Sequence, residues 1–307
     1  MSDLADARGA AGRPPGGLPG RIAFLGFGLI GGSIAAALRS RGGRGARLVA
    51  WTPTGSGPAE GVRRGFLDRA ASSVGEALEG ADLVVLAGPP LAIIATLRDD
   101  RATLLAVAEA GATITDVGST KRAIVGAARE AGLPFVGGHP MAGRETTGAA
   151  TSSADLFIDR PWVIVPGDAA RPIDLDRVEA LARATGARPV RLGADEHDAA
   201  VAAISHLPLV VAAALVEAVA GRDLEGWTLA RSLAATGWSD TTRLAKGDPE
   251  MGAGILATNA DAVAERLRAM RAVLDAWIEE LEGAPAPDDL RRRLEAARQT
   301  LLEANPG

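Results

Sequence analysis

Acid–base chemistry in this chain is confined to few side chains, because the sequence contains three histidines, no cysteine and no tyrosine. The lack of cysteine excludes disulfides, thiolate nucleophiles and cysteine-ligated metals. The lack of tyrosine excludes the Tyr–Lys acid/base pair of short-chain dehydrogenases. The histidines, His139, His197 and His206, can therefore be weighed one by one.

His139 is the strongest candidate for a general base. It follows a short apolar run and stands between glycines and Pro140, which is typical of a loop at the edge of a sheet. A solvent-accessible imidazole in such a loop titrates near neutrality and can take a proton from a substrate. The alternative is a loop histidine that caps backbone groups.

His197 and His206 stand nine positions apart in a helical segment. At about 100° per residue they lie on opposite faces of a straight helix and cannot share a metal ion, so we expect no metal site. Pro208 removes the hydrogen bond to the Ile204 carbonyl and predicts a kink beside His206. We expect His206 to contact a ligand or to be a satisfied core group. His197, among acidic residues, is expected at the surface or in support of a neighbouring side chain.

A glycine-rich turn follows the first apolar run, in the segment RIAFLGFGLIGGS. In its G-x-G-x-x-G pattern Gly26 permits a tight turn, Gly28 lets the backbone approach a pyrophosphate, and Gly31 allows close helix–strand packing. The following helix begins with a positive dipole end that favours phosphates. Because the motif lies between a strand and a helix, it predicts dinucleotide binding and not merely a structural turn.

Cofactor choice is less defined than cofactor binding. NAD-selective sites carry an acidic residue about 20 positions after the glycines, whereas here the second strand is followed by Thr52. This admits NADP as well as NAD, although Arg63 or Arg64 would have to reach back to a 2′-phosphate. The residues assigned to the cofactor are Gly26, Gly28, Leu29, Ile30, Gly31, Thr52 and Pro89.

Further polar residues stand where ligands are expected. Ser119 and Thr120 come between a strand and a helix, at the carboxyl edge of a parallel sheet. Arg243 could bind a carboxylate with two parallel hydrogen bonds, although an arginine on a helix surface is the simpler reading of that residue alone.

The elements that must position these residues alternate between strands and helices as far as Gly193. Helices on both faces of a doubly wound parallel sheet are expected, because the strands are continuous apolar runs. We predict a disordered tail at residues 1–20, a dinucleotide-binding domain at 21–193 and a helical domain at 194–307. The predicted strands are Ile22–Leu25, Leu48–Trp51, Leu83–Ala87, Thr113–Val117, Phe135–Gly137, Trp162–Val165 and Pro189–Leu192.

The second domain is expected to be helical throughout. Apolar residues from Val263 to Leu281 step by four and three positions, which predicts a helix with one apolar seam that faces either the core or another subunit. Asp248-Pro249 and Pro287 have the sequence of helix starts.

Charge and hydropathy limit the partners and the location. With 33 Lys and Arg against 38 Asp and Glu, the formal net charge is −5, which argues against nucleic acid. The first 20 residues are rich in Gly and Pro and do not resemble a signal peptide. The most apolar stretch, Leu207–Val216, is half the ~20 residues needed to cross a bilayer. We therefore expect a cytoplasmic protein with no membrane partner.

Four blocks in order carry a resemblance to a known family. These are GFGLIGGS at 26–33, DVGSTK at 116–121, GGHPMAG with Arg144 and Glu145 at 137–145, and SHLP at 205–208, followed by Asp240–Arg243. With these blocks the chain resembles the prephenate/arogenate dehydrogenase family from Arg21 to about Leu281.

The resemblance implies a Rossmann-like domain followed by an all-helical dimerisation domain. It implies oxidative decarboxylation of prephenate or arogenate, with hydride transfer to NAD or NADP, giving 4-hydroxyphenylpyruvate or tyrosine. His139 would take the ring hydroxyl proton and Ser119 would hold that hydroxyl. The implied substrate-binding residues are His206, Arg243, Glu145 and Arg144. The expected partners are a small-molecule substrate and a second copy of the chain.

Two departures from the family pattern leave alternatives open. Leu209 replaces a second histidine after SHLP, so prephenate, arogenate and the 4-amino analogue all remain candidate substrates. Thr52 replaces the usual acidic residue. A β-hydroxyacid dehydrogenase or imine reductase would share the fold but use a lysine in the helical domain, where Lys246 is the sole lysine. A non-catalytic dinucleotide-binding dimer is a second alternative.

Overall fold

The computed structural model describes residues 17–41, 45–144, 146–221, 224–284 and 286–304. Residue contacts divide the chain into two units, 1–262 and 263–307, and each is described by itself. The predicted domain division at residue 194 stays a prediction. Of the predicted disordered tail, residues 1–16 lie outside the described residues. The prediction was wrong for the last part of the tail, because Leu18 is buried in the core.

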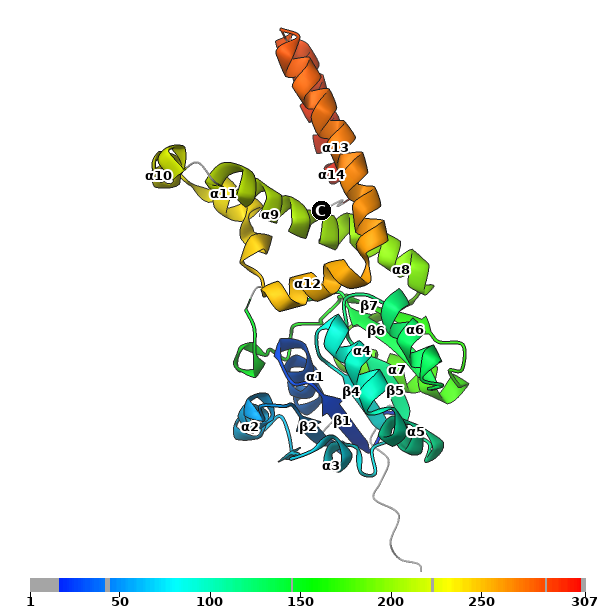
Figure 1. The fold of residues 1–307 in the computed structure, drawn as a ribbon. Helices are drawn as coiled ribbons and strands as arrows, with labels where there is room; N and C mark the ends of the chain where they lie inside the picture. Colours follow the sequence, from blue (N-terminus) through cyan, green and yellow to red (C-terminus); the bar gives the residue numbers. More distant parts are fainter. Residues whose placement is uncertain (1–16, 42–44, 145, 222–223, 285, 305–307) are drawn as a thin grey trace, which may run out of the picture. The chain divides into compact units, whose positions relative to one another are not determined.

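The first unit is built on an eight-stranded sheet with the order β3-β2-β1-β4-β5-β6-β7-β8 (Figure 1). Neighbouring strands are parallel except for β6 and β7, which are antiparallel, so the prediction of a wholly parallel sheet was wrong at this pair. The strands are β1 (Arg21–Leu25), β2 (Arg47–Trp51), β3 (Arg69–Ala70), β4 (Leu83–Leu86), β5 (Thr113–Asp116), β6 (Phe135–Pro140), β7 (Pro161–Pro166) and β8 (Arg188–Arg191).

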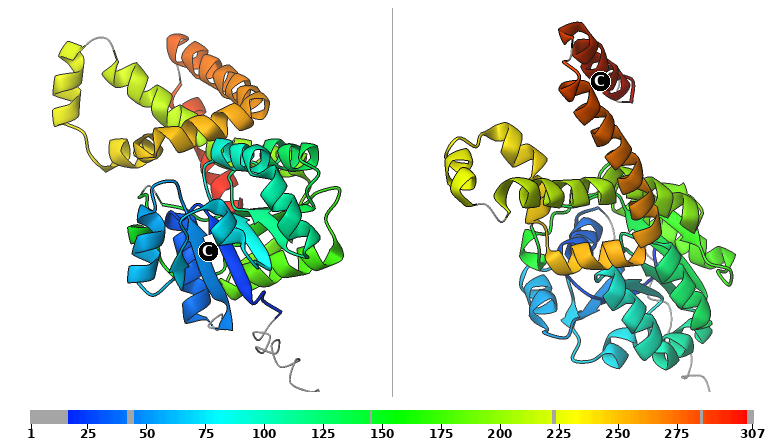
Figure 2. Two further views of the ribbon diagram at one scale, coloured as in Figure 1. Left: turned by 60° about the horizontal axis from the view of Figure 1, so that its bottom comes forward. Right: turned by 45° about the horizontal axis from the view of Figure 1, so that its top comes forward.

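Helices cover both faces of this sheet (Figure 2). The sides of β1 alternate between two cores: Ile22 and Phe24 pack with α1 and α7, and Ala23 and Leu25 pack with α3, α4, α5 and α6. The expected doubly wound α/β domain is therefore confirmed. The helices on the sheet are α1 (Leu29–Ser40), α2 (Ser56–Arg63), α3 (Val74–Leu78), α4 (Pro90–Asp99), α5 (Arg101–Glu109), α6 (Arg122–Glu130) and α7 (Pro172–Ala184).

After the sheet, the described residues are helical. In the first unit these helices are α8 (Ala194–Val201), α9 (Leu207–Ala220), α10 (Leu224–Ser232), α11 (Thr236–Thr241) and α12 (Pro249–Thr258). Asp248 caps α12, because its carboxylate accepts hydrogen bonds from the amides of Glu250 and Met251, as its sequence predicted.

A π-helical turn, Ala202–His206, joins α8 to α9. Such a turn absorbs the disruption caused by Pro208, so the predicted irregularity beside His206 is present. The helical run Ala194–Ala220 is long and apolar enough to cross a membrane by length and composition alone. This run is longer than the ten-residue apolar stretch noted in the sequence. A single such helix is weak evidence for a membrane span, and His197, Asp198 and His206 in its first half are buried within the protein.

The second unit contains most of α13 (Ala260–Glu282) and all of α14 (Pro287–Ala304). The two helices contact each other where Arg293 stacks on Trp277, 3.9 Å from the ring centroid, and pairs with Glu280. Pro287 begins α14, as predicted. Leu274 and Leu281 of the predicted seam are about half exposed.

Candidate active site

The end of β5 fixes the segment that carries His139. The buried carboxylate of Asp116 accepts hydrogen bonds from the amides of Gly118, at 2.8 Å, and Gly138, at 3.0 Å. A Cβ at Gly138 would lie 2.5 Å from the Asp116 carbonyl oxygen, so only glycine allows β6 to approach β5 this closely. His139 is the next residue of β6 and therefore has a fixed backbone position.

Asp116 also pairs with Lys121, and both side chains are fully buried. Burial opposes the charged forms of both groups, which raises the pKa of Asp116 and lowers the pKa of Lys121, although their mutual attraction acts in the opposite direction. This pair closes the loop between β5 and α6, which contains the half-buried Ser119.

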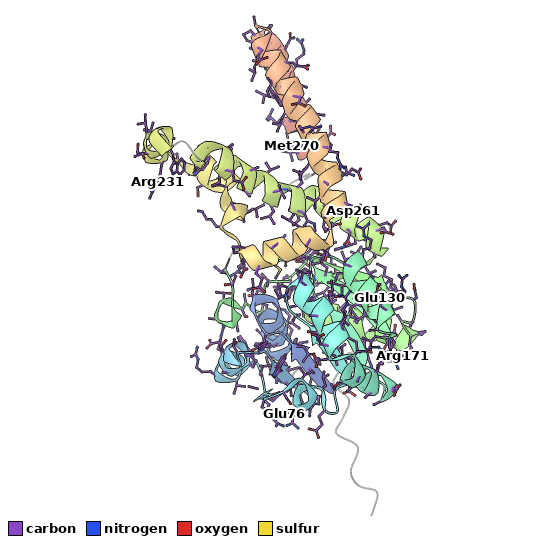
Figure 3. All side chains as sticks on the ribbon, viewed as in Figure 1. Glu76, Glu130, Arg171, Arg231, Asp261 and Met270 are labelled. Atoms are coloured by element: carbon purple, nitrogen blue, oxygen red, sulfur yellow. The ribbon has the colours of Figure 1, made fainter. Side chains whose placement is uncertain are left out.

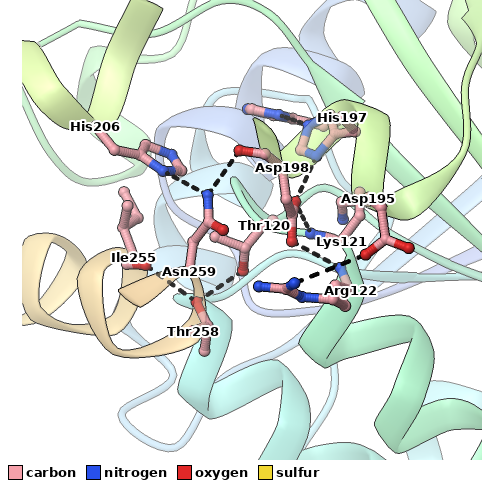
Figure 4. A network of polar contacts seen from close by, with 12 residues as sticks. Thr120, Lys121, Arg122, Asp195, His197, Asp198, His206, Ile255, Thr258 and Asn259 are labelled. Atoms are coloured by element: carbon pink, nitrogen blue, oxygen red, sulfur yellow. Dashed lines mark hydrogen bonds and ion pairs between the residues drawn. The ribbon is translucent and has the colours of Figure 1, made fainter. Parts of the chain in front are cut away.

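His139 is in direct contact with a second imidazole. Its Nδ1 lies 2.8 Å from Nε2 of His197, and Nδ1 of His197 lies 2.7 Å from Oδ1 of Asp198. His197 is only 1 % exposed, so its predicted surface position was wrong and its predicted supporting position is the one observed. The contacts join β6 of the sheet to α8. Figure 4 shows His197 and Asp198 of α8 beside Lys121 and Arg122.

The electrostatic surroundings favour the neutral form of His139. Burial, followed by the neighbouring His197, Lys121 and His206, lowers the pKa of His139 well below 6.5. The prediction of a solvent-accessible imidazole that titrates near neutrality was therefore wrong, because the histidine lies within β6 and is half-buried. At neutral pH the ring has a free electron pair and can accept a proton.

The surroundings of Asp198 favour its charged form, unlike those of His139. Burial would raise the pKa of its carboxyl, but hydrogen bonds from His197 and from the amides of Lys121 and Arg122 outweigh it and lower that pKa. The hydrogen bonds from these two amides measure 2.7 and 2.9 Å. The amides belong to the start of α6, where unpaired N–H groups favour an anion. Arg122 also pairs with Asp261, which is labelled in Figure 3.

His206 lies in the same network through Asn259. Nδ2 of Asn259 lies 3.2 Å from Nδ1 of His206 and donates a hydrogen bond of 2.8 Å to the main-chain carbonyl of Asp198. Burial lowers the pKa of His206 to about 4, more than the attraction of Asp198 raises it. Nε2 of His206 and Oδ1 of Asn259 are buried and have no hydrogen-bond partner in the described residues.

His197 and His206 thus belong to one network, which the straight-helix argument did not predict. The π-helical turn between them has more residues per turn than an α-helix, so it rotates less per residue and the two side chains are not on opposite faces as they would be on a straight helix. No group of three side chains able to hold a metal ion is found among the residues that were described.

The glycine turn has the geometry that its sequence predicts. Gly26 adopts φ +96°, and a Cβ there would lie 2.5 Å from the Ala87 carbonyl oxygen at the end of β4. A Cβ at Gly31 would lie 3.2 Å from the Gly26 carbonyl oxygen, whereas one at Gly28 would meet nothing within 4 Å. Gly28 caps α1 without a side-chain hydrogen bond, so the first amides of α1 remain available for a diphosphate.

The other residues assigned to the cofactor stand at the same edge of the sheet. Leu29 and Ile30 form the first turn of α1, and Pro89 precedes α4 after β4. Thr52 follows β2, and its hydroxyl accepts a hydrogen bond from the amide of Gly55.

Both arginines that follow the second strand, Arg63 and Arg64, are already engaged with other protein groups. Arg63 pairs with Glu60. Arg64 donates hydrogen bonds to the carbonyls of Ala149, Ala150 and Ser152 and stacks on Phe66.

The remaining assigned residues are more scattered. Thr120 is hydrogen-bonded to Thr258 of α12 at 2.8 Å. Arg243 is exposed in a 3₁₀ turn, Arg243–Lys246, that packs against α9. Arg144 is exposed after β6, and Glu145 lies outside the described residues.

Sequence reasoning assigned no role to four residues of the network: Asp116, Lys121, Asp198 and Asn259. Asp116 and Lys121 bracket the DVGSTK block, and Asp198 adjoins His197, so a search for charged neighbours could have found them. Asn259 has no such signal, because α12 brings it to His206 from 53 positions away.

The sheet order and the glycine turn define a Rossmann-type nucleotide-binding protein with a helical second part. The chain belongs to the prephenate dehydrogenase family: residues 34–191 match its nucleotide-binding domain and residues 193–296 match its dimerization domain.

Several relatives agree with this assignment. The chain is 32% identical to prephenate dehydrogenase of Bacillus subtilis over 85% of this chain and 68% of that protein. It is 30% identical to cyclohexadienyl dehydrogenase of Zymomonas mobilis over 79% and 82% of the two chains.

Two solved structures are also similar. Prephenate dehydrogenase from A. aeolicus, in complex with hydroxyphenyl propionate and NAD+, has a TM-score of 0.84 at 26% identity, covering 93% of this chain and 98% of that one. Synechocystis arogenate dehydrogenase has a TM-score of 0.75 at 32% identity, covering 93% and 100%.

Proposed function

We propose that the protein oxidatively decarboxylates prephenate or arogenate with reduction of NAD(P), in the tyrosine branch of aromatic amino acid biosynthesis. The observation that carries the proposal is the half-buried His139, which lies 2.8 Å from His197 in the part of the chain that matches the family's nucleotide-binding domain, and whose pKa is lowered by burial. Such an imidazole accepts a proton at neutral pH.

The residues at the glycine turn fit a dinucleotide. The open space at Gly28 and the uncapped start of α1 suit a diphosphate, and Leu29, Ile30, Thr52 and Pro89 would line the rest of that site. The chemistry that the dinucleotide supplies when bound is acceptance of a hydride from C4 of the substrate ring.

Proton transfer and substrate positioning are carried out by side chains of this chain. His139 accepts the C4 hydroxyl proton while the C4–H bond breaks, and Ser119 holds that hydroxyl. The bond from C1 to the ring carboxylate then breaks, carbon dioxide leaves, and its electron pair makes the ring aromatic. The oxygen recovers its proton from His139, so the proton balance closes.

The far end of the substrate carries a carboxylate and a keto or amino group. In this proposal His206, Arg243, Arg144 and Glu145 bind that end. The positive charge of the arginines offsets the repulsion between an anionic substrate and a chain of net charge −5.

Cofactor preference follows from the loop after β2. Thr52 does not repel a 2′-phosphate, and the guanidinium of Arg64 already donates hydrogen bonds to three backbone carbonyls in place of such a phosphate. We infer that the protein accepts both NAD and NADP with little discrimination.

The proposal extends to assembly and location. Half-exposed leucines on α13 and the match to a dimerization domain support a homodimer. The biosynthetic role supports a cytoplasmic location and a small-molecule substrate without nucleic acid or membrane partners.

The test is an absorbance assay at the reduced nicotinamide band, with prephenate, arogenate and the 4-amino analogue, each with NAD and NADP. Reduction with release of one carbon dioxide per turnover supports the proposal. Dinucleotide binding without reduction on any of the three would replace it with the non-catalytic alternative.

A further inference from the structure

We propose that Asp198 and Asn259 are positioning residues that hold His139 and His206 in opposite tautomers. His139 then presents an unprotonated Nε2, and His206 presents a protonated Nε2. What the two nitrogens do for a substrate rests on the proposed function, whereas the tautomers follow from the contacts alone.

The first chain of contacts ends at a carboxylate. An ionised carboxylate only accepts hydrogen bonds, so Nδ1 of His197, 2.7 Å from Asp198, carries a proton. In a neutral ring Nε2 of His197 is then an acceptor, and His139 must donate to it from Nδ1 across 2.8 Å. This leaves the proton-free electron pair of His139 on Nε2.

The second chain of contacts ends at a carbonyl. The main-chain oxygen of Asp198 also only accepts, so the nitrogen of the Asn259 carboxamide faces it at 2.8 Å. That orientation fixes the amide, and the second hydrogen of the same nitrogen points to Nδ1 of His206 at 3.2 Å. Nδ1 of His206 is therefore an acceptor, and in a neutral ring the proton is on Nε2.

Asp198 is the common origin of both chains. Its carboxylate also accepts hydrogen bonds from the amides of Lys121 and Arg122, at 2.7 and 2.9 Å, so it is anchored to the start of α6 on the sheet side. One residue at the start of the helical part thus sets the proton positions of two imidazoles through different groups, its side chain and its carbonyl.

Opposite tautomers allow the two imidazoles to bind different groups of a substrate. A bare Nε2 at His139 suits a hydroxyl that must lose its proton, and an N–H at His206 suits an acceptor oxygen such as a carboxylate or keto oxygen. Because Nε2 of His206 has no hydrogen-bond partner among the described residues, a substrate that supplies an acceptor there satisfies an otherwise costly N–H group.

Nuclear magnetic resonance tests the tautomers directly, because the chain has only three histidines. Long-range ¹H–¹⁵N spectra of the full ¹⁵N-labelled chain, with a histidine-free affinity tag and without ligand, distinguish protonated from unprotonated ring nitrogens. We expect Nδ1–H at His139 and His197 and Nε2–H at His206 at neutral pH. Nε2–H at His139, Nδ1–H at His206, or a doubly protonated ring at either position would overturn the proposal.

Two variants should separate the chains of contacts. Asp198→Asn replaces a pure acceptor with a group that also donates, so His139 loses its single tautomer while His206 keeps its own through the main-chain carbonyl. Asn259→Asp removes the donor, so the proton of His206 moves to Nδ1 while His139 is unaffected. A change of both rings in either variant contradicts independent control. If a variant does not fold, the wild-type spectrum still decides.

Kinetics supply the second readout. Asp198→Asn should lower kcat on the order of 10²-fold and change its pH profile, whereas Asn259→Asp should raise KM about 10-fold or more and lower kcat less. Asp68→Asn is the matched control, since Asp68 also accepts a backbone amide hydrogen bond, from Leu48, but at the opposite end of β2. If the expected tautomers are found and no substrate is oxidised, the proposed function fails and the positioning roles stand.

Discussion

Nδ1 of His139 lies 2.8 Å from Nε2 of His197, and the two rings meet edge to face with centroids 5.0 Å apart. One ring belongs to β6 of the sheet and the other to α8, the first helix after the sheet. The proposed base is therefore correctly oriented only when sheet and helix are packed together, so the chemistry depends on both parts of the chain.

Replacing His139 should remove proton transfer without removing the cofactor. His139→Asn keeps a polar side chain of similar reach but lacks a basic nitrogen, so kcat should fall by roughly 10² to 10⁴-fold. Dinucleotide affinity, measured by calorimetry on the same sample, should stay within about twofold, because the glycine turn lies on other strands. Turnover close to that of the wild type would refute the role of His139.

The pH profile should lack a histidine step near neutrality. With its pKa well below 6.5, His139 is already in the base form at pH 6.5, so kcat/KM should be level from there to pH 8. It should decline only on further acidification, when the ring gains a proton. The groups that act on His139 are His197 from α8, His206 from the π-helical turn, and Lys121, which pairs with Asp116 at the end of β5. Asp198 acts on it only through His197. A midpoint at pH 6.5 or above would contradict this electrostatic account.

The fold was largely predictable from the sequence, because most strands are short apolar runs with turn residues on both sides. The two-residue strand β3, Arg69–Ala70, is exposed and has no apolar run, and it was not predicted. The error at β7 has a physical cause: the run Pro161–Pro166 looks the same whether it pairs parallel or antiparallel, and β6 and β7 are joined by a loop and not by a covering helix. The placement of His139 failed for a related reason, since β6 extends three residues beyond the predicted end at Gly137.

The candidate site was predictable only where its residues are neighbours in sequence. The glycine turn and the SHLP block are local patterns, so the spacing of neighbouring residues was enough to recognise them. The links from Asp198 to Lys121 and from His206 to Asn259 span 77 and 53 positions. Such contacts depend on how α8 and α12 pack on the sheet, which periodicity does not specify.

Acid should destabilise the fold through His206. Its pKa is about 4 when folded against about 6.5 in an unfolded chain, so between these values the unfolded chain binds a proton that the folded chain does not. The free energy of unfolding should therefore fall as pH drops from 6.5 to 4, by at most about 3 kcal/mol from this group.

Chemical denaturation at several pH values measures that slope for the wild type and for His206→Asn. The variant should lose part of the slope between pH 6.5 and 4, whatever its absolute stability. An unchanged slope would show that His206 is not buried as a neutral ring.

Thr52 should control the choice of cofactor. Thr52→Asp places a carboxylate after β2, which repels a 2′-phosphate and accepts hydrogen bonds from a ribose. The ratio of kcat/KM for NAD to that for NADP should rise by about 10-fold or more, whereas Thr54→Asp, at an exposed position two residues on, should change it less. Equal effects of the two variants would assign the change to general charge and not to position 52.

Gly28 and Gly26 should fail in different ways when a methyl group is added. A Cβ at Gly28 meets no atom within 4 Å, so Gly28→Ala should keep its thermal midpoint yet weaken dinucleotide binding, because the methyl group occupies the approach of the diphosphate. Gly26→Ala places a Cβ 2.5 Å from the Ala87 carbonyl oxygen at φ +96° and should lower the midpoint itself. Gly75→Ala, equally open in α3, should change neither property for the worse. Scanning calorimetry and a binding titration on the three variants separate the outcomes, and unimpaired binding by Gly28→Ala would argue that the turn has a structural role only.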